Sequence, residues 1–227
     1  MFSVHLRFGA VLVMCAVFLP GADVVGESAV GDDKIQRVFD VKIHQALEAF
    51  EKGDYAQTSQ CIEEAEIILP GQTTTRNIQA AVLYKQRKYD EALAVYDQIV
   101  AVDPTSFTGH FNRAEVKLAQ KKYDAALDIY RMILTSAPGN ELCKFKIVVV
   151  LLLKGDMKGA MDQANEMPLP GMSAAPFFAR AAVAYQTGDP RKGMEWVNKS
   201  EEYFSREDSR MLREVMVEAG WWKSDQK

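Results

Sequence analysis

The chain of 227 residues has the composition of an ordinary globular protein, with 48% hydrophobic residues, 26% charged residues and a net charge of -4. This apolar content is sufficient for one continuous core or one solenoid. The acidic balance argues against general nucleic-acid binding, because a grip on phosphates requires a clustered basic surface.

The first 26 residues differ sharply in composition from the rest of the chain. A short basic start is followed by an uncharged apolar run from Phe8 to Leu19 and then by the helix breakers Pro20 and Gly21. This layout predicts a secretory signal peptide over residues 1–26, with cleavage after Gly26. The apolar run is shorter than the roughly 20 residues that span a bilayer as a helix, and uncleaved anchoring is the alternative.

We therefore expect an exported protein, periplasmic or extracellular in a bacterium, whose mature form begins near Glu27 and is soluble. N-terminal sequencing of the isolated protein checks this expectation. An intact Met1 on protein that stays with membranes after a salt wash would contradict cleavage and would favour an anchor.

A short segment, residues 27–38, separates the signal peptide from the first apolar period. It is small, acidic and glycine-containing at its start, and it has no apolar period to bury. We predict a flexible leader over residues 27–33 and the entry to the first helix over the remainder, with order beginning near Lys34.

A strict period then appears in two residue types at once. Tyr55, Tyr89 and Tyr123 are evenly spaced, and each is followed at one constant distance by a proline. The period of about 34 residues is the length of a repeat that consists of two helices. The predicted units are residues 39–72, 73–106, 107–140, 141–170 and 173–204.

Small residues recur where the two helices of a unit must approach closely. One column stands before the tyrosine position and the other stands one helical turn after it. These residues are Ala46, Ala80, Ala114, Thr58, Ala92 and Ala126, with Gly193 in the corresponding place of the fifth unit. Close helix crossing explains both columns.

The motifs around the tyrosines resemble tetratricopeptide repeats. They read Gly53-Asp54-Tyr55, Tyr89-Asp90-Glu91-Ala92 and Tyr123-Asp124-Ala125-Ala126, each with its later proline. The resemblance implies an all-α fold, a right-handed superhelical solenoid of antiparallel helix pairs. It also implies that the first helices line a concave groove and that the protein acts as a binding scaffold.

An apolar stripe along the first helices has two interpretations. Its aromatic members either hold the two helices of each unit together as core or line an unusually apolar groove. The candidates for the groove are Phe50, Tyr84, Phe111, Phe145, Phe178 and Tyr185. We expect Phe145 to be core and Phe111 to be partly exposed, since its neighbours in the sequence are polar.

A second column along the first helices is cationic. Lys42, Arg76, His110 and Lys144 recur with the period of the tyrosines and are predicted to lie along one face. This column either receives an acidic peptide or is an ordinary solvated surface balanced by neighbouring carboxylates.

The end of the chain, residues 205–227, is predicted to form a capping helix and a tail. Ser205 and Gly220 are suited to begin and to close this helix. Trp221 and Trp222 follow directly. They either pack over the last helix pair or serve as an exposed anchor for a partner.

The sequence contains no arrangement of residues that indicates catalysis, a cofactor or a metal site. We therefore predict a non-catalytic scaffold that presents its concave surface to a peptide or protein partner, without nucleic-acid binding or stable membrane insertion after signal removal. The alternative is a structural subunit of an envelope or secretion assembly that makes contact through its edges and its C-terminal cap.

Overall fold

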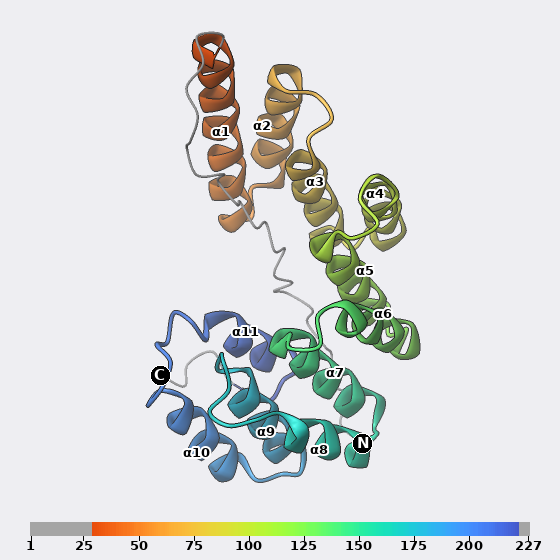
Figure 1. The fold of residues 1–227 in the computed structure, drawn as a ribbon, viewed down its shortest axis with the longest axis vertical. Helices are drawn as coiled ribbons and strands as arrows, with labels where there is room; N and C mark the ends of the chain where they lie inside the picture. The colour runs from red at the N-terminus through yellow and green to blue at the C-terminus, as the bar shows by residue number, and fades with distance from the viewer. Residues whose placement is uncertain (1–28, 223–227) are drawn as a thin grey trace. The chain divides into compact units, whose positions relative to one another are not determined.

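The computed structural model describes residues 29–222, which are drawn as coloured ribbon in Figure 1. The predicted signal peptide and the last five residues of the predicted tail lie outside the described residues. Between Ala29 and Trp222 the structure contains eleven helices and no strand, which confirms the predicted all-α fold. None of the described helices is both long enough and apolar enough to cross a membrane.

The helices are α1 (Ala29–Glu51), α2 (Tyr55–Ile68), α3 (Thr73–Lys85), α4 (Tyr89–Val102), α5 (Phe107–Ala119), α6 (Tyr123–Ser136), α7 (Glu141–Lys154), α8 (Met157–Glu166), α9 (Ala175–Gln186), α10 (Pro190–Ser200) and α11 (Arg210–Glu218).

The helices pack as consecutive pairs within two compact units, which divide between Val116 and Lys117. In the first unit α1 packs on α2 and α3 packs on α4, and α3 also contacts both helices of the preceding pair. In the second unit α7 packs on α8 and α9 packs on α10, and α9 also contacts α7 and α8. The first helices α3 and α9 therefore pack on their own partners and on the preceding pair, as in a helical solenoid.

The first helix begins earlier than the sequence indicated. Because α1 begins at Ala29, the prediction of a flexible leader is wrong for residues 29–33, whereas residues 34–38 are helical as expected for the helix entry. The guanidinium of Arg37 donates to the carboxylate of Asp33, and Gln36 donates to Asp40 at 2.8 Å. Pairs at this spacing stabilise an exposed helix by about 0.2 to 0.5 kcal/mol each, without the apolar period that sequence reading relies on.

The turn inside each pair places one column of the repeat in the left-handed backbone region. The φ angles in this column are +75° at Gly53, +62° at Arg87, +60° at Lys121 and +90° at Gly155. Glycine adopts this conformation freely, whereas a residue with a Cβ adopts it at a cost of about 1 to 2 kcal/mol. The second and third pairs therefore carry strain that the first and fourth pairs do not.

We expect that Arg87→Gly and Lys121→Gly each stabilise the fold by up to about 1 kcal/mol, because the relief of Cβ strain exceeds the extra entropy that glycine loses on folding. Urea unfolding followed by circular dichroism measures the effect. Gln86→Gly is the matched control, since φ at Gln86 is -76° and glycine offers no relief there. Destabilisation by both substitutions would contradict this account of the turns.

The predicted close-packing columns are fully buried. The side chains of Ala46, Ala80, Ala114, Thr58, Ala92 and Ala126 are all 0% exposed. In the fifth pair a Cβ on Gly193 would lie only 2.4 Å from Cε2 of Tyr185. The ring of Tyr185 therefore occupies the space that any larger residue at this position would need.

The helix of the C-terminal cap ends as predicted, just before Gly220, but it begins at Arg210 and not at Ser205, so its predicted beginning is wrong. The backbone N–H of Asp208 donates to Ser205 Oγ at 3.1 Å, and the chain forms a turn over residues 206–209 before α11 starts at Arg210. Gly220 has a φ of +75° and stands just past the end of α11. The predicted element therefore opens with a turn, and α11 packs on α9.

Candidate functional site

The aromatic residues predicted to line a groove are buried or half-buried. Phe111 and Tyr84 are only 2% and 3% exposed, and Phe145 is fully buried. Phe50 and Tyr185 are half-buried. The expectation that Phe111 is partly exposed is wrong, and the interpretation of this stripe as core is the one that the structure supports.

These rings are buried because they pack back onto their own helix pair. The ring centroids are 5.7 Å apart for Phe50 and Tyr55, and 5.4 Å apart for Tyr84 and Tyr89. Tyr55 and Tyr89 are the first residues of α2 and α4, so each contact joins the end of a first helix to the start of the second. The tyrosine of the repeat therefore secures the turn between the two helices.

Two of the four residues in the cationic column, Lys42 and His110, form hydrogen bonds within the fold. Nζ of Lys42 lies 2.5 Å from Oε2 of Glu64, and this hydrogen bond raises the pKa of Lys42 above its ordinary value. The Nε2–H of His110 donates to the carbonyl oxygen of Pro104 at 2.9 Å. Arg76 and Lys144 are half-buried, and among the described residues neither pairs with a carboxylate. The balanced-surface interpretation therefore holds for Lys42.

The two tryptophans after α11 pack on the last helix pair, so the idea of an exposed tryptophan pair as an anchor is wrong. Trp222 is only 7% exposed, and its ring stacks on those of Phe178 and Tyr185, with centroid separations of 6.4 and 6.5 Å. The indole N–H of Trp221 donates to Oε1 of Gln186 at 2.6 Å. The cap is therefore bound to α9 by aromatic stacking and a hydrogen bond.

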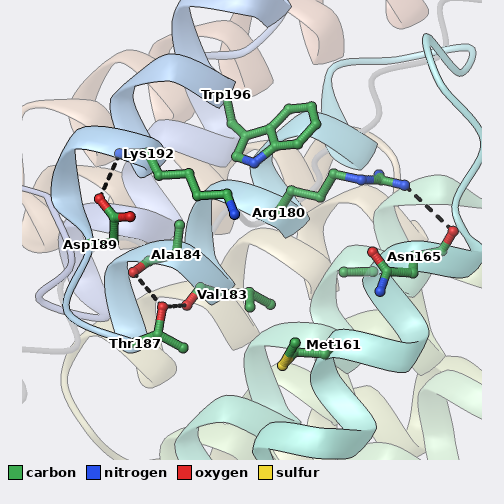
Figure 2. A pocket seen from close by; sticks show the side chains of 10 residues that line it. Met161, Asn165, Arg180, Val183, Ala184, Thr187, Asp189, Lys192 and Trp196 are labelled. Carbon is green, nitrogen blue, oxygen red and sulfur yellow. Dashed lines mark hydrogen bonds between the residues drawn. The ribbon is translucent and has the colours of Figure 1, made fainter.

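A pocket of about 240 Å³ opens between α8, α9 and α10, within the second unit (Figure 2). Its lining combines cationic, aromatic and polar side chains from all three helices or their ends. They include Met161, Asn165, Arg180, Thr187, Lys192 and Trp196. This combination of an aromatic surface and nearby cations is typical of binding sites.

Arg180 is held in place by backbone carbonyl groups of α9 and of the end of α8. Its Nη1 donates to the carbonyl oxygen of Pro176 and its Nη2 donates to that of Met167, both at 2.9 Å. Partial burial lowers the pKa of Arg180 from its ordinary value, but an arginine remains a cation at neutral pH. Among the described residues, no carboxylate forms an ion pair with this guanidinium.

Trp196 presents a half-buried indole beside this guanidinium. Cζ of Arg180 lies 5.7 Å from the ring centroid, and Nζ of Lys199 lies 5.6 Å from it. The ring also contacts Phe177 of α9, at a centroid separation of 6.4 Å. Trp196 is therefore held by contact with the buried ring of Phe177 and is flanked by two cations. Its indole ring provides the aromatic surface of the pocket.

Lys192 adds a second cation, and the pocket contains one carboxylate, that of Asp189. The backbone N–H of Lys192 donates to Oδ1 of Asp189 at 2.9 Å, so this carboxylate caps α10. The lysine side chain is exposed and, in the described part of the chain, forms no ion pair. Two cations against one carboxylate leave one positive charge unbalanced in the pocket.

The repeat pattern of the sequence does not reveal this site, because its residues are distributed over three helices. Arg180 is a single charge within the apolar helix α9, and Lys192, Trp196 and Lys199 follow one another at steps of four and three residues along α10. Such steps place side chains on one face of a helix. An isolated charge in an apolar helix and a cationic face with a tryptophan are the signals that indicate this region.

The hydroxyl group in the pocket lining is hydrogen-bonded to the backbone. The hydroxyl of Thr187 donates to the carbonyl oxygens of Ala184 and Val183, at 2.9 and 3.1 Å. Within residues 29–222, no group of three or more His, Cys, Asp or Glu side chains is placed to hold a metal ion. The arrangement is therefore suited to hold an anion next to an apolar group.

Comparison with known families supports the resemblance to tetratricopeptide repeats. The model of the tetratricopeptide repeat family matches residues 79–141, a stretch that runs from α3 to the start of α7. None of the curated proteins matches the sequence.

Two solved structures share the fold at low sequence identity. A thermophilic tetratricopeptide repeat protein from Thermus thermophilus is 15% identical, with a TM-score of 0.62 over 79% of this chain and 98% of that chain. A tetratricopeptide repeat protein from Parabacteroides merdae is also 15% identical, with a TM-score of 0.52 over 82% of this chain and 75% of that chain. At this identity the similarity shows a solenoid of helix pairs and nothing about partners.

Proposed function

We propose that the chain is a non-catalytic scaffold that binds a protein partner, and that the pocket between α8, α9 and α10 lies on its binding surface. Proteins with tetratricopeptide repeats generally act as interaction scaffolds, and residues 79–141 match that family. The observation that carries the choice of surface is the unbalanced positive charge beside the half-buried Trp196. Tryptophan and arginine are the residue types most enriched among interface hot spots.

This surface replaces the aromatic groove as the proposed binding face. A ring that is 2% or 3% exposed, as in Phe111 and Tyr84, has almost no area left for a partner to cover. The pocket, in contrast, is open to solvent through Met161, which is 44% exposed, and through Lys192. We also propose export to the periplasm or the extracellular space. This part of the proposal rests on the predicted signal peptide alone.

Affinity capture from the native compartment, followed by mass spectrometry, tests the proposal. The captured protein is expected to be lost with Lys192→Glu and retained with Arg191→Glu. Arg191 is the matched control because it is the preceding residue of α10, its side chain is 92% exposed and it pairs with Glu195 outside the pocket. No specific partner for the unaltered protein, or equal loss with both variants, would contradict this surface.

An observation on α1 favours the structural subunit as a second candidate. Ile35, Val38 and Val41 are 45%, 44% and 54% exposed and follow one another at steps of three residues along the helix. Apolar side chains gathered on one exposed helix face are typical of contact surfaces. If capture from the native compartment is lost with Val38→Glu and not with Lys192→Glu, the edge and not the pocket makes the contact.

A further inference from the structure

We propose that the pocket between α8, α9 and α10 recognises a single carboxylate of an acidic segment in the protein partner, with an adjacent apolar side chain placed against Trp196. This inference rests on the proposed function and names the chemistry of the partner. Arg180 and Lys192 both line this pocket, and in Figure 2 both side chains lie below the ring of Trp196, with the guanidinium of Arg180 turned toward Asn165. An anion in the pocket would be attracted by both cations.

Arg180 retains hydrogen-bonding capacity for such a ligand. An arginine carries five N–H groups. Two donate to the carbonyl oxygens of Pro176 and Met167, and a third points to that of Asn165 at a long distance of 3.5 Å. The N–H of Nε and one N–H of Nη1 remain without an acceptor among the described residues. The guanidinium is therefore positioned by the protein and still able to donate to an oxyanion.

The charge of the pocket favours a carboxylate over a phosphate. Among the side chains that line the pocket, Arg180 and Lys192 supply two positive charges and Asp189 supplies one negative charge, so a single negative charge balances the lining. Lys199 lies over the ring of Trp196 but does not line the pocket. A phosphate group carries close to two negative charges at neutral pH and would be repelled by Asp189. The same balance is reached by one glutamate or aspartate side chain of a peptide.

The apolar side of the pocket defines what accompanies the carboxylate. Met161 and Trp196 lie on opposite sides of the cations in Figure 2, and Val183 and Ala184 lie between them. A methionine side chain adapts to irregular apolar surfaces, and an indole ring provides a flat one. An aliphatic residue next to the acidic residue would therefore be partly removed from water when the carboxylate binds.

Titration of the ¹⁵N-labelled protein with blocked short peptides tests the inference through the indole resonances of the three tryptophans. The probes contain one glutamate beside a leucine, the same peptide with glutamine, and the same peptide with phosphoserine. The Trp196 resonance, identified by its loss in Trp196→Phe, is expected to shift with the glutamate peptide and not with the glutamine peptide. Trp221 and Trp222 are expected to shift much less, because neither lines the pocket.

Matched charge variants define the site. Lys192→Gln is expected to weaken the glutamate peptide about tenfold, the usual effect of losing one charge-assisted contact, whereas Arg191→Gln changes the affinity by less than about twofold. Lys192 is chosen over Arg180 because its side chain holds no part of the fold, while Arg180 also binds two backbone carbonyls. Equal effects of the two variants would mean a diffuse attraction and would overturn the proposal.

The remaining outcomes separate this inference from the proposed function. A shift with the phosphoserine peptide alone, or equal shifts with the glutamate and glutamine peptides, overturns the carboxylate assignment. If no peptide shifts Trp196 while capture still depends on Lys192, the inference fails and the scaffold proposal stands. If the glutamate peptide binds as expected but no partner is captured, the carboxylate site stands and the scaffold proposal fails.

Discussion

Replacing Phe111 or Phe145 with alanine is expected to lower the free energy of unfolding by about 3 to 5 kcal/mol, the usual cost of removing a buried phenylalanine. Phe111 is 2% exposed and Phe145 is 0% exposed, in different compact units. Each substitution leaves a cavity in a packed interior, which relaxes only in part. Urea unfolding of the single variants, followed by circular dichroism, measures both losses.

The control for this pair is Phe50→Ala. Phe50 is only half-buried and packs against Tyr55, so its removal is expected to cost clearly less than that of Phe111. A small loss for Phe111→Ala together with a loss of partner binding would contradict the burial of this ring. In that case Phe111 would line a groove, which was one of the two interpretations of the sequence.

Trp222→Ala is expected to cost about 3 kcal/mol, at the lower end for a buried aromatic ring because the site is near the end of the chain. The ring stacks on Phe178 and Tyr185, and Cζ of Arg213 lies 5.1 Å from its centroid. Removing it exposes the apolar face of α9 and loosens α11. Urea unfolding, together with the exchange rates of the α11 amides, measures the effect.

Trp221→Ala is the matched control, because the two residues are neighbours of the same type in different surroundings. Trp221 is half-buried and donates a hydrogen bond to Gln186, so its loss is expected to cost about 1 kcal/mol. If Trp222→Ala left the stability unchanged and abolished partner binding, Trp222 would be an anchor for the partner and the packing described above would be wrong.

The helix pairs were predictable because the repeat marks where the second helices begin as well as which residues pack between the helices. The second helices α2, α4 and α6 begin at Tyr55, Tyr89 and Tyr123, the residues whose period defined the units, and α8 begins one period later at Met157. The small-residue columns were predictable for the same reason, since they are imposed by the distance between the helices.

Burial of the aromatic stripe was not predictable from periodicity. A helical period identifies a continuous apolar face, but it does not say whether another helix or a solvated groove covers that face. The polar neighbours of Phe111 suggested exposure, yet Asn112 and Glu115 are themselves only 1% and 5% exposed. Polar residue types therefore misled the interpretation at a position where packing decides.

The pocket was not predictable because it depends on contacts between helices that do not recur from one repeat to the next. Asn165 and Trp196 lie in parts of the fourth and fifth pairs that depart from the period of the tyrosines. The fixed position of Arg180 depends on the carbonyl of Met167, just past the end of the short helix α8. These relations are tertiary and leave no periodic signal.

Hydrogen–deuterium exchange of the protein, with and without its captured partner, tests the proposed binding surface most directly. The account predicts slower exchange of the amides in α8 and in the first two turns of α10, around Lys192 and Trp196, with smaller changes in α3 and α5. Protection confined to α1, or to the first helices α3 and α5 with α8 and α10 unchanged, would contradict the pocket as the place where the partner binds.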